Sequence, residues 1–91
     1  MPPKNMYVVV LKKRADKQFE RLPDRDQTRI LLALQSLRED PFSGKKLDGD
    51  LDGFYVIRIW PYRIMYIIEK KIVTVTVVAI GHRKDVYRGL R

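Results

Sequence analysis

Three runs of β-branched and aromatic residues occupy most of the second half of the chain, and only short breaks separate them. The runs are FYVIRIW (residues 54–60), RIMYII (63–68) and IVTVTVVAI (72–80). Residues of these types are enriched in β-strands, and each run has the length of one strand. The first break is Pro61-Tyr62 and the second is Glu69-Lys70-Lys71. We therefore expect three consecutive strands joined by two turns, the first two strands forming a hairpin.

The first part of the chain combines one strand with two helices. Residues 6–11, MYVVVL, have the composition of a strand, and beyond them the apolar residues recur every three or four positions, which is typical of helices buried on one side. The two apolar stripes are Leu11, Ala15, Phe19 and Leu22, and then Ile30, Ala33, Leu34 and Leu37. Asp24 and Gln27 have the spacing of an N-cap and capping box, so we expect Asp24 to cap the second helix. Pro41 disfavours a helical conformation at the residue before it, which predicts an end near Glu39.

Residues 40–53 contain mainly Gly, Asp, Pro and Ser, and we expect them to form a connecting loop. The element order is then β-α-α-β-β-β, with a short C-terminal segment. In an α+β fold of this kind, a helical hairpin packs on one face of a mainly antiparallel four-stranded sheet. Nothing in the composition divides the chain, so we expect residues 1–91 to form one domain.

Alternation along the strands predicts which side chains share a face of the sheet. In the run at 54–60, Tyr55, Ile57 and Ile59 share one face, so Arg58 lies on the other. If the three apolar residues pack against the helices, Arg58 points to the open side. In the run at 72–80 the pattern predicts one face made of Val73, Val75, Val77 and Ala79, opposite Thr74 and Thr76.

The cysteine and histidine content excludes several classes of protein. The absence of cysteine excludes a disulfide-stapled domain, a zinc ribbon and thiol catalysis. One histidine, His82, is too few for a metal site with the usual imidazole ligands, so we expect no metal and no cofactor. No apolar stretch is long enough to span a membrane, and residues 1–14 show no export signal, so we expect a cytoplasmic protein.

The chain carries a formal net charge of +8, and the excess is concentrated at its two ends. Residues 1–14 hold four basic groups and no acid, and residues 54–91 hold eight basic groups and two acids. The intervening residues carry slightly more acids than bases. A basic surface clustered on a small domain is typical of a protein that binds a polyanion, with nucleic acid as the first choice.

The candidate site residues lie late in the chain. Arg58 and Arg63 flank the turn of the predicted hairpin and lie close together across it, and arginine is well suited to binding phosphate. Arg63 has an alternative partner in Glu69. The segment after the last strand contributes further candidates, namely His82, Arg83, Lys84, Tyr87 and Arg88. Tyr87 either takes part in the site or packs the tail onto the sheet, and the residues alone leave both roles open.

Four motifs in this region resemble a known family. They are K-L-x-G (residues 46–49), Y-x-x-R (55–58), Y-R-x-x-Y (62–66) and G-H-R-x-x-V-Y (81–87). Together they resemble the RelE/ParE superfamily of toxins from toxin–antitoxin systems, and RelE more closely than ParE. The resemblance covers nearly the whole chain, and the family fold, a helical hairpin against a small antiparallel sheet, agrees with the predicted element order.

The resemblance implies a toxin that cuts mRNA in the ribosomal A site and thereby halts translation. It also implies an antitoxin that wraps the toxin; we expect it to be acidic and to fold on contact. Whether it covers the basic face or displaces the C-terminal segment stays open. Carried over to this chain, the active residues of RelE fall on Arg58, Arg63, Arg83 and Tyr87. One position departs from the family, because the first of two strand lysines falls on Val56, which cannot donate a hydrogen bond or carry charge.

These residues are consistent with RNA cleavage by the 2′-hydroxyl of the RNA itself, which leaves a 2′,3′-cyclic phosphate. Arg63 and Arg83 suit the phosphate, and Arg58 suits an orienting charge. Arginine stays protonated and is a poor base, so the candidates for proton transfer are Tyr87 and, ranked below it, His82. The remaining basic residues that we expect to hold the ribosomal RNA backbone are Lys45, Lys46, Lys84 and Arg88.

Two other functions are compatible with the sequence. A ParE-like toxin would have the same fold but would poison DNA gyrase and cut no RNA. The G-H-R-x-x-V-Y motif argues against that function, whereas Val56 argues mildly for it. A non-catalytic nucleic-acid-binding module would bind RNA in a salt-dependent way and leave it intact.

Overall fold

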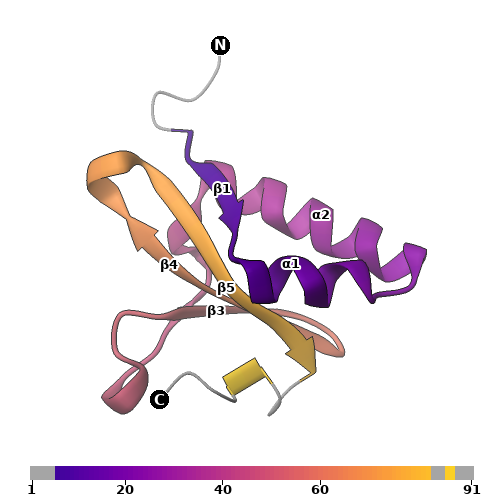
Figure 1. The fold of residues 1–91 in the computed structure, drawn as a ribbon. Coiled ribbons are helices and arrows are strands. Elements are labelled where there is room, and N and C mark those ends of the chain that lie inside the picture. The colour runs from indigo at the N-terminus through magenta and orange to yellow at the C-terminus, as the bar shows by residue number, and fades with distance from the viewer. Residues whose placement is uncertain (1–5, 83–85, 88–91) are drawn as a thin grey trace.

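The computed structural model describes residues 6–82, 86 and 87, and it contains a five-stranded sheet covered on one face by two helices (Figure 1). The strand order is β1-β5-β4-β3-β2, with β1 parallel to β5 and the other neighbours antiparallel. The elements are β1 (Val8–Leu11), α1 (Lys13–Glu20), α2 (Asp24–Glu39), β2 (Lys45–Lys46), β3 (Tyr55–Ile59), β4 (Tyr62–Glu69) and β5 (Thr74–His82). Short 3₁₀ turns lie at Pro41–Ser43, Gly49–Leu51 and Lys70–Ile72. The predicted α+β class and helical hairpin on a mainly antiparallel sheet are confirmed, but the sheet has five strands and not the four predicted, because β2 joins it.

The helical hairpin buries its predicted stripes against the sheet. Ala15 from α1 and the four stripe residues of α2 are buried with side chains of β4 and β5 in the main core. The expected capping box does not form, because α2 begins at Asp24 with Pro23 at the N-cap position and no side-chain cap. Gln27 instead donates from Nε2 to the Phe19 carbonyl oxygen at 3.1 Å, which ties the start of α2 to the end of α1. The helix ends at Glu39, as predicted.

A β-bulge in the sheet overturns one prediction about its faces. In the pairing of β4 with β5, Met65 lies opposite Ala79 and Tyr66 opposite Val77, so the bulge leaves Val78 between them without a partner in the register. The extra residue reverses the alternation along β5. Ala79 is therefore buried on the face away from the helices, whereas Val77 is buried in the main core. The prediction that Ala79 shares a face with Val75 and Val77 was wrong.

The open face has a second, smaller core at one end. Val56, Met65, Ala79 and Val86 are buried together there, with Tyr87 packed against them. Val86 and Tyr87 form a short turn after β5 that returns over this face. The sheet is therefore covered on both sides at the end where the candidate site residues lie.

The loop predicted for residues 40–53 contains an additional short strand, β2, which pairs with β3. Tyr66 fixes the segment that leads into β2. Its hydroxyl donates to the Pro41 carbonyl oxygen at 2.7 Å and accepts from the Gly44 N–H at 3.2 Å. A Cβ atom at Gly44 would overlap the Tyr66 hydroxyl and would lie 2.8 Å from the Val56 carbonyl oxygen. The close approach of β2 to the sheet therefore requires glycine at this position.

Burial raises the pKa of Tyr66 to about 12. The free energy of unfolding is therefore expected to fall at alkaline pH. An unfolded tyrosine has a pKa of about 10, so the folded state holds this proton more tightly. The contribution of the protonated Tyr66 hydroxyl to the free energy of unfolding is fully present below pH 10. It is lost as the pH rises towards 12, a loss on the order of 2–3 kcal/mol. We expect Tyr66→Phe, measured by urea unfolding from pH 8 to 12, to be less stable than wild type at pH 8 and to lack this decline. Parallel curves for the two proteins would contradict the prediction, since lysine titration affects both equally.

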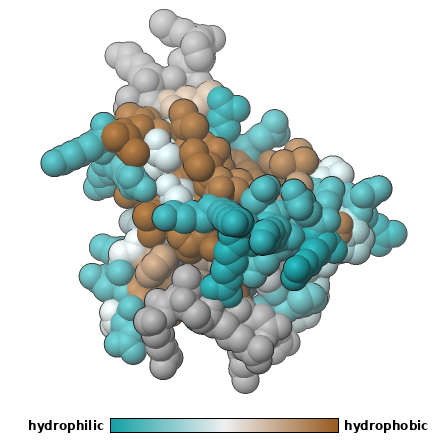
Figure 2. All heavy atoms as spheres, in the orientation of Figure 1, coloured by the Kyte–Doolittle hydropathy of each residue, from teal (hydrophilic) through white to brown (hydrophobic). Residues whose placement is uncertain are grey.

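Among the described residues, no helix combines the length and apolar character needed to cross a membrane. Hydrophobic side chains at the surface gather over β1 and the neighbouring turn between β4 and β5 (Figure 2). The exposed apolar residues in this region are Val8, Val10, Ile72 and Val73.

Candidate active site

The hairpin of β3 and β4 places Arg58 and Arg63 directly opposite each other in the register. Tyr55, Ile57 and Ile59 pack against the main core under the helices, so alternation directs both arginines to the open face. This confirms the predicted side of the sheet for Arg58. Two arginines that are register partners on one face concentrate positive charge at this point of the hairpin.

Helix α2 holds the turn of this hairpin in place. Arg29 donates from Nη2 to the Trp60 carbonyl oxygen at 2.6 Å, and the Tyr62 hydroxyl donates to Oδ2 of Asp26 at 2.6 Å. This hydrogen bond to Asp26, together with burial, raises the pKa of Tyr62 above its ordinary value. The arginines therefore lie on a hairpin that is fastened at its turn by the helix layer.

Tyr87 lies next to Arg63. Nη1 of Arg63 donates to the Tyr87 hydroxyl oxygen at 3.0 Å, and Cζ of Arg63 lies 5.9 Å from the centre of the tyrosine ring. Val86 is fully buried in the second core and anchors the turn that carries the tyrosine. The possible ion pair of Arg63 with Glu69 is not formed, since the Glu69 carboxylate instead accepts from Thr76 at 3.0 Å. Tyr87 thus both packs the tail onto the sheet and faces the arginine.

A cavity of about 320 Å³ opens between β2 and these residues. Lys45, Arg58 and Arg63 contribute positive charge to its lining, and Leu47 and Val56 contribute apolar surface. Within the described part of the chain, no carboxylate lines it. A cavity lined by cations together with apolar side chains and a tyrosine ring matches a phosphate with an attached base.

The two lysines of β2 have different surroundings. Lys45 pairs in register with Val56 and lines the cavity, whereas Lys46 pairs with Tyr55 and is absent from the lining. Ser43 and Leu47 also line the cavity, because β2 joins the edge of the sheet, and the sequence did not identify them as site residues. Only the pairing of the loop with β3, which its composition does not indicate, could have identified them.

His82 lies away from the cavity. It pairs with Tyr62 at the end of β5, and its ring centre lies 4.9 Å from the Tyr62 ring, which is part of the main core under the helices. His82 and the Arg63–Tyr87 pair are therefore on different faces of the sheet. The other predicted residues of the tail, Arg83, Lys84 and Arg88, lie outside the described residues.

The chain is similar to toxins of type II toxin–antitoxin systems. Residues 9–87 match the family of the ParE toxin of the type II system parDE. The chain is 31% identical over 84 residues to Toxin RelG of Mycobacterium tuberculosis, which covers 90% of this chain and 97% of that protein.

Solved structures of RelE toxins have the same fold. The RelBE2 toxin–antitoxin complex of Mycobacterium tuberculosis superposes with a TM-score of 0.81 at 27% identity, covering 91% of this chain and 98% of the other. The isolated Escherichia coli RelE toxin superposes with a TM-score of 0.74 at 26% identity, covering 89% and 90% of the two chains. The arrangement of helices and sheet is therefore that of RelE toxins along almost the whole chain.

Proposed function

This chain belongs to the RelE/ParE superfamily of toxins from type II toxin–antitoxin systems, and we propose that it cleaves mRNA in the ribosomal A site. The observation that carries the proposal is the hydrogen bond from Arg63 to Tyr87 at the cationic cavity, with Arg58 opposite. Cleavage of RNA by its own 2′-hydroxyl is accelerated by a cation at the phosphate and by a positioned proton-transfer group, and Arg63 and Tyr87 offer one of each in direct contact.

In the proposed reaction, the RNA 2′-hydroxyl attacks the neighbouring phosphorus and the 5′-oxygen of the next nucleotide leaves. A 2′,3′-cyclic phosphate remains. The 2′-hydroxyl passes its proton to a base, for which Tyr87 is proposed, and the leaving 5′-oxygen takes up one proton from water. Arg63 stabilises the negative charge that develops on the phosphate oxygens, and Arg58 orients the phosphate from the opposite strand. Arg83, which lies outside the described residues, remains proposed as a second phosphate-binding arginine.

Tyr87 is the proposed proton-transfer residue. Arginine is always protonated at neutral pH, so neither Arg58 nor Arg63 can act as a base. The Tyr87 hydroxyl accepts a charge-assisted hydrogen bond from Arg63, which stabilises negative charge on this oxygen during proton transfer. His82 has no role in the proposed mechanism, because its ring lies against Tyr62, tilted by 52°, on the other face of the sheet.

Lys45 offers a replacement for the cation that is missing at Val56. The two residues are register partners on adjacent strands, and both line the cavity. The positive charge that a basic residue at position 56 would bring to the cavity is supplied by the lysine side chain from β2. The departure at Val56 is therefore compatible with the proposed chemistry.

Cleavage of mRNA on programmed ribosomes tests the proposal directly. The full chain, freed of antitoxin, is added to ribosomes with a defined codon in the A site, and the mRNA fragments are mapped at both ends. We expect fragments ending in a 2′,3′-cyclic phosphate within the A-site codon. Intact mRNA on ribosomes that demonstrably bind the toxin would overturn the proposal.

A ParE-like activity is the second candidate, because the matched family is described by the ParE toxin. Such a toxin would arrest DNA gyrase and leave mRNA intact. Induction in cells separates the two activities: mRNA cleavage with arrested translation supports the first, and a DNA-damage response with filamentation supports the second.

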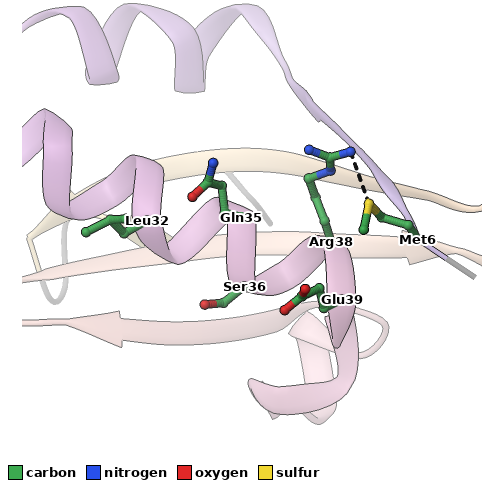
Figure 3. Close-up of a pocket in the computed structure, with 6 residues that line it drawn as sticks. All are labelled: Met6, Leu32, Gln35, Ser36, Arg38 and Glu39. Carbon is green, nitrogen blue, oxygen red and sulfur yellow. Dashed lines mark hydrogen bonds between the residues drawn. The ribbon is translucent and has the colours of Figure 1, made fainter. Parts of the chain in front are cut away.

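The proposed partner is an antitoxin, as in the RelBE2 complex to which the chain is similar. The edge strand β1 offers it an apolar surface, since Val8 is 58% and Val10 47% exposed. Beside the start of β1, a depression of about 480 Å³ lies against α2, where Arg38 donates to the Met6 sulfur at 3.2 Å (Figure 3). Exposed edge strands and apolar patches are normally covered. We place an extended antitoxin segment along β1.

Substitution at Val10 tests this placement. We expect Val10→Glu to weaken antitoxin binding by at least tenfold, measured by titration calorimetry, while mRNA cleavage by the free toxin is retained. The matched control is Leu31→Glu, because Leu31 is an equally exposed apolar residue of α2, at 51%, that does not line the depression. Equal antitoxin affinity of the two variants would place the antitoxin elsewhere.

A further inference from the structure

Helix α1 presents a row of cations to the solvent. Lys13, Lys17 and Arg21 follow one another at intervals of four residues, the last at the C-cap of the helix. At a rise of 1.5 Å per residue, successive members of the row are about 6 Å apart along the helix axis. All three residues are exposed. The row therefore forms a linear array of positive charge on the outer side of the helix layer.

The cations of α1 spread over one side of the helix, and its two acids lie at one edge of that side. At about 100° per residue, the row and Arg14 span about 100° around the helix axis, with Glu20 next to Lys13 and Asp16 beyond it. Across the described chain, the one ion pair is that of Arg29 with Asp26, which leaves the α1 cations without a carboxylate partner. Figure 2 shows hydrophilic side chains crowded over α1.

A depression of about 430 Å³ runs along this side of α1 and is lined by Lys13, Arg14, Lys17, Gln18 and Arg21. Its lining contains no acidic and no aromatic side chain among the described residues. Such a surface offers charge and hydrogen-bond donors and has no apolar group to insert into a membrane. It also has no ring on which a base could stack, so it is suited to a sugar–phosphate backbone.

The row lies close to the candidate active site but on the other side of the sheet. Oε1 of Gln18 accepts a hydrogen bond from the Ile80 N–H at 2.7 Å, which holds α1 against the end of β5. The next residue, Gly81, is the register partner of Arg63. The end of β5 therefore lies between the candidate active site on the open face and α1, which carries the row of cations.

We propose that the cationic face of α1, made of Lys13, Arg14, Lys17 and Arg21, is a second RNA-binding site that holds the phosphate backbone of ribosomal RNA. This inference rests on the proposed function. The mRNA strand that occupies the cavity would have to bend around the end of β5 to reach α1. A separate RNA strand meets no such obstacle, so the toxin binds between two RNA segments, one on each face.

The test compares two variants that lose the same charge. Lys13→Gln/Lys17→Gln removes two members of the row, and the control Lys70→Gln/Lys71→Gln removes two exposed lysines of the turn between β4 and β5. Binding of the full chain to 70S ribosomes is measured at several salt concentrations. We expect the first variant to bind about tenfold more weakly, with the slope of log affinity against log salt smaller by about 1 to 2. The control is expected to keep nearly the wild-type affinity and slope.

Cleavage kinetics separate this site from the active site. We expect the α1 variant to raise the KM for programmed ribosomes while kcat at saturation stays at the wild-type value. If both double variants bind ribosomes alike, the second site is refuted although cleavage persists. If the α1 variant instead loses affinity only for the antitoxin, the face binds an acidic protein and the inference is wrong. Absence of both ribosome binding and cleavage in the wild type would refute the proposed function itself.

Discussion

Replacing Arg63 by alanine is expected to lower mRNA cleavage on programmed ribosomes by about 10²–10³-fold, because a preorganised cation at the developing charge is lost. Arg63 is the residue that joins the parts of the site. It lies opposite Arg58 across the hairpin, opposite Gly81 on β5, and donates to Tyr87 at 3.0 Å. The effect should appear in kcat more than in KM, since Arg58 and Lys45 still attract the phosphate.

The control for this prediction is Arg63→Lys, which keeps the charge but loses the planar fork of the guanidinium. We expect it to recover part of the activity, and circular dichroism and urea unfolding should show both variants folded. Cleavage by Arg63→Ala within threefold of wild type would contradict the assignment of this residue to the phosphate.

The positions of Arg58 and Arg63 followed from the sequence because strand alternation is strict. A run with Tyr55, Ile57 and Ile59 on one face must carry Arg58 on the other, and a turn of two residues keeps Arg63 on the same face as Arg58. The turn was predicted one residue too late, because it lies at Trp60-Pro61 and Tyr62 already belongs to β4, and this shift places Arg63 directly opposite Arg58. The end of the second helix at Glu39 was predictable for a similar reason, since Pro41 restricts the backbone locally. Where a single local rule dominates, the sequence is sufficient.

Other features depend on contacts between distant residues, and the pattern did not reveal them. The bulge opposite Met65 and Tyr66 reverses the faces of β5, and no residue type marks it in the sequence. It also determines which side of the sheet His82 occupies. Likewise β2 consists of two lysines, a composition typical of a loop, and it forms because Gly44 fits against the Tyr66 hydroxyl.

Tyr87→Phe is expected to lower kcat for cleavage by about 10²–10⁴-fold, the range for loss of a positioned acid or base. The variant keeps the aromatic ring, and Val86 stays buried, so the tail should remain packed on Val56 and Met65. Only the oxygen that accepts from Arg63 is lost. We expect unchanged ribosome affinity and unchanged stability in urea. A retained kcat would show that the ring, and not the hydroxyl, contributes to the site.

The double variant Arg63→Ala/Tyr87→Phe distinguishes proton transfer from simple positioning. If Tyr87 served only to hold the guanidinium in place, removing its hydroxyl from a protein that already lacks Arg63 would cost nothing further. A proton-transfer role predicts an additional loss of kcat in the double variant and a changed pH–rate profile for Tyr87→Phe alone. Equal kcat for Arg63→Ala and the double variant would assign Tyr87 to positioning and require another group to move the proton.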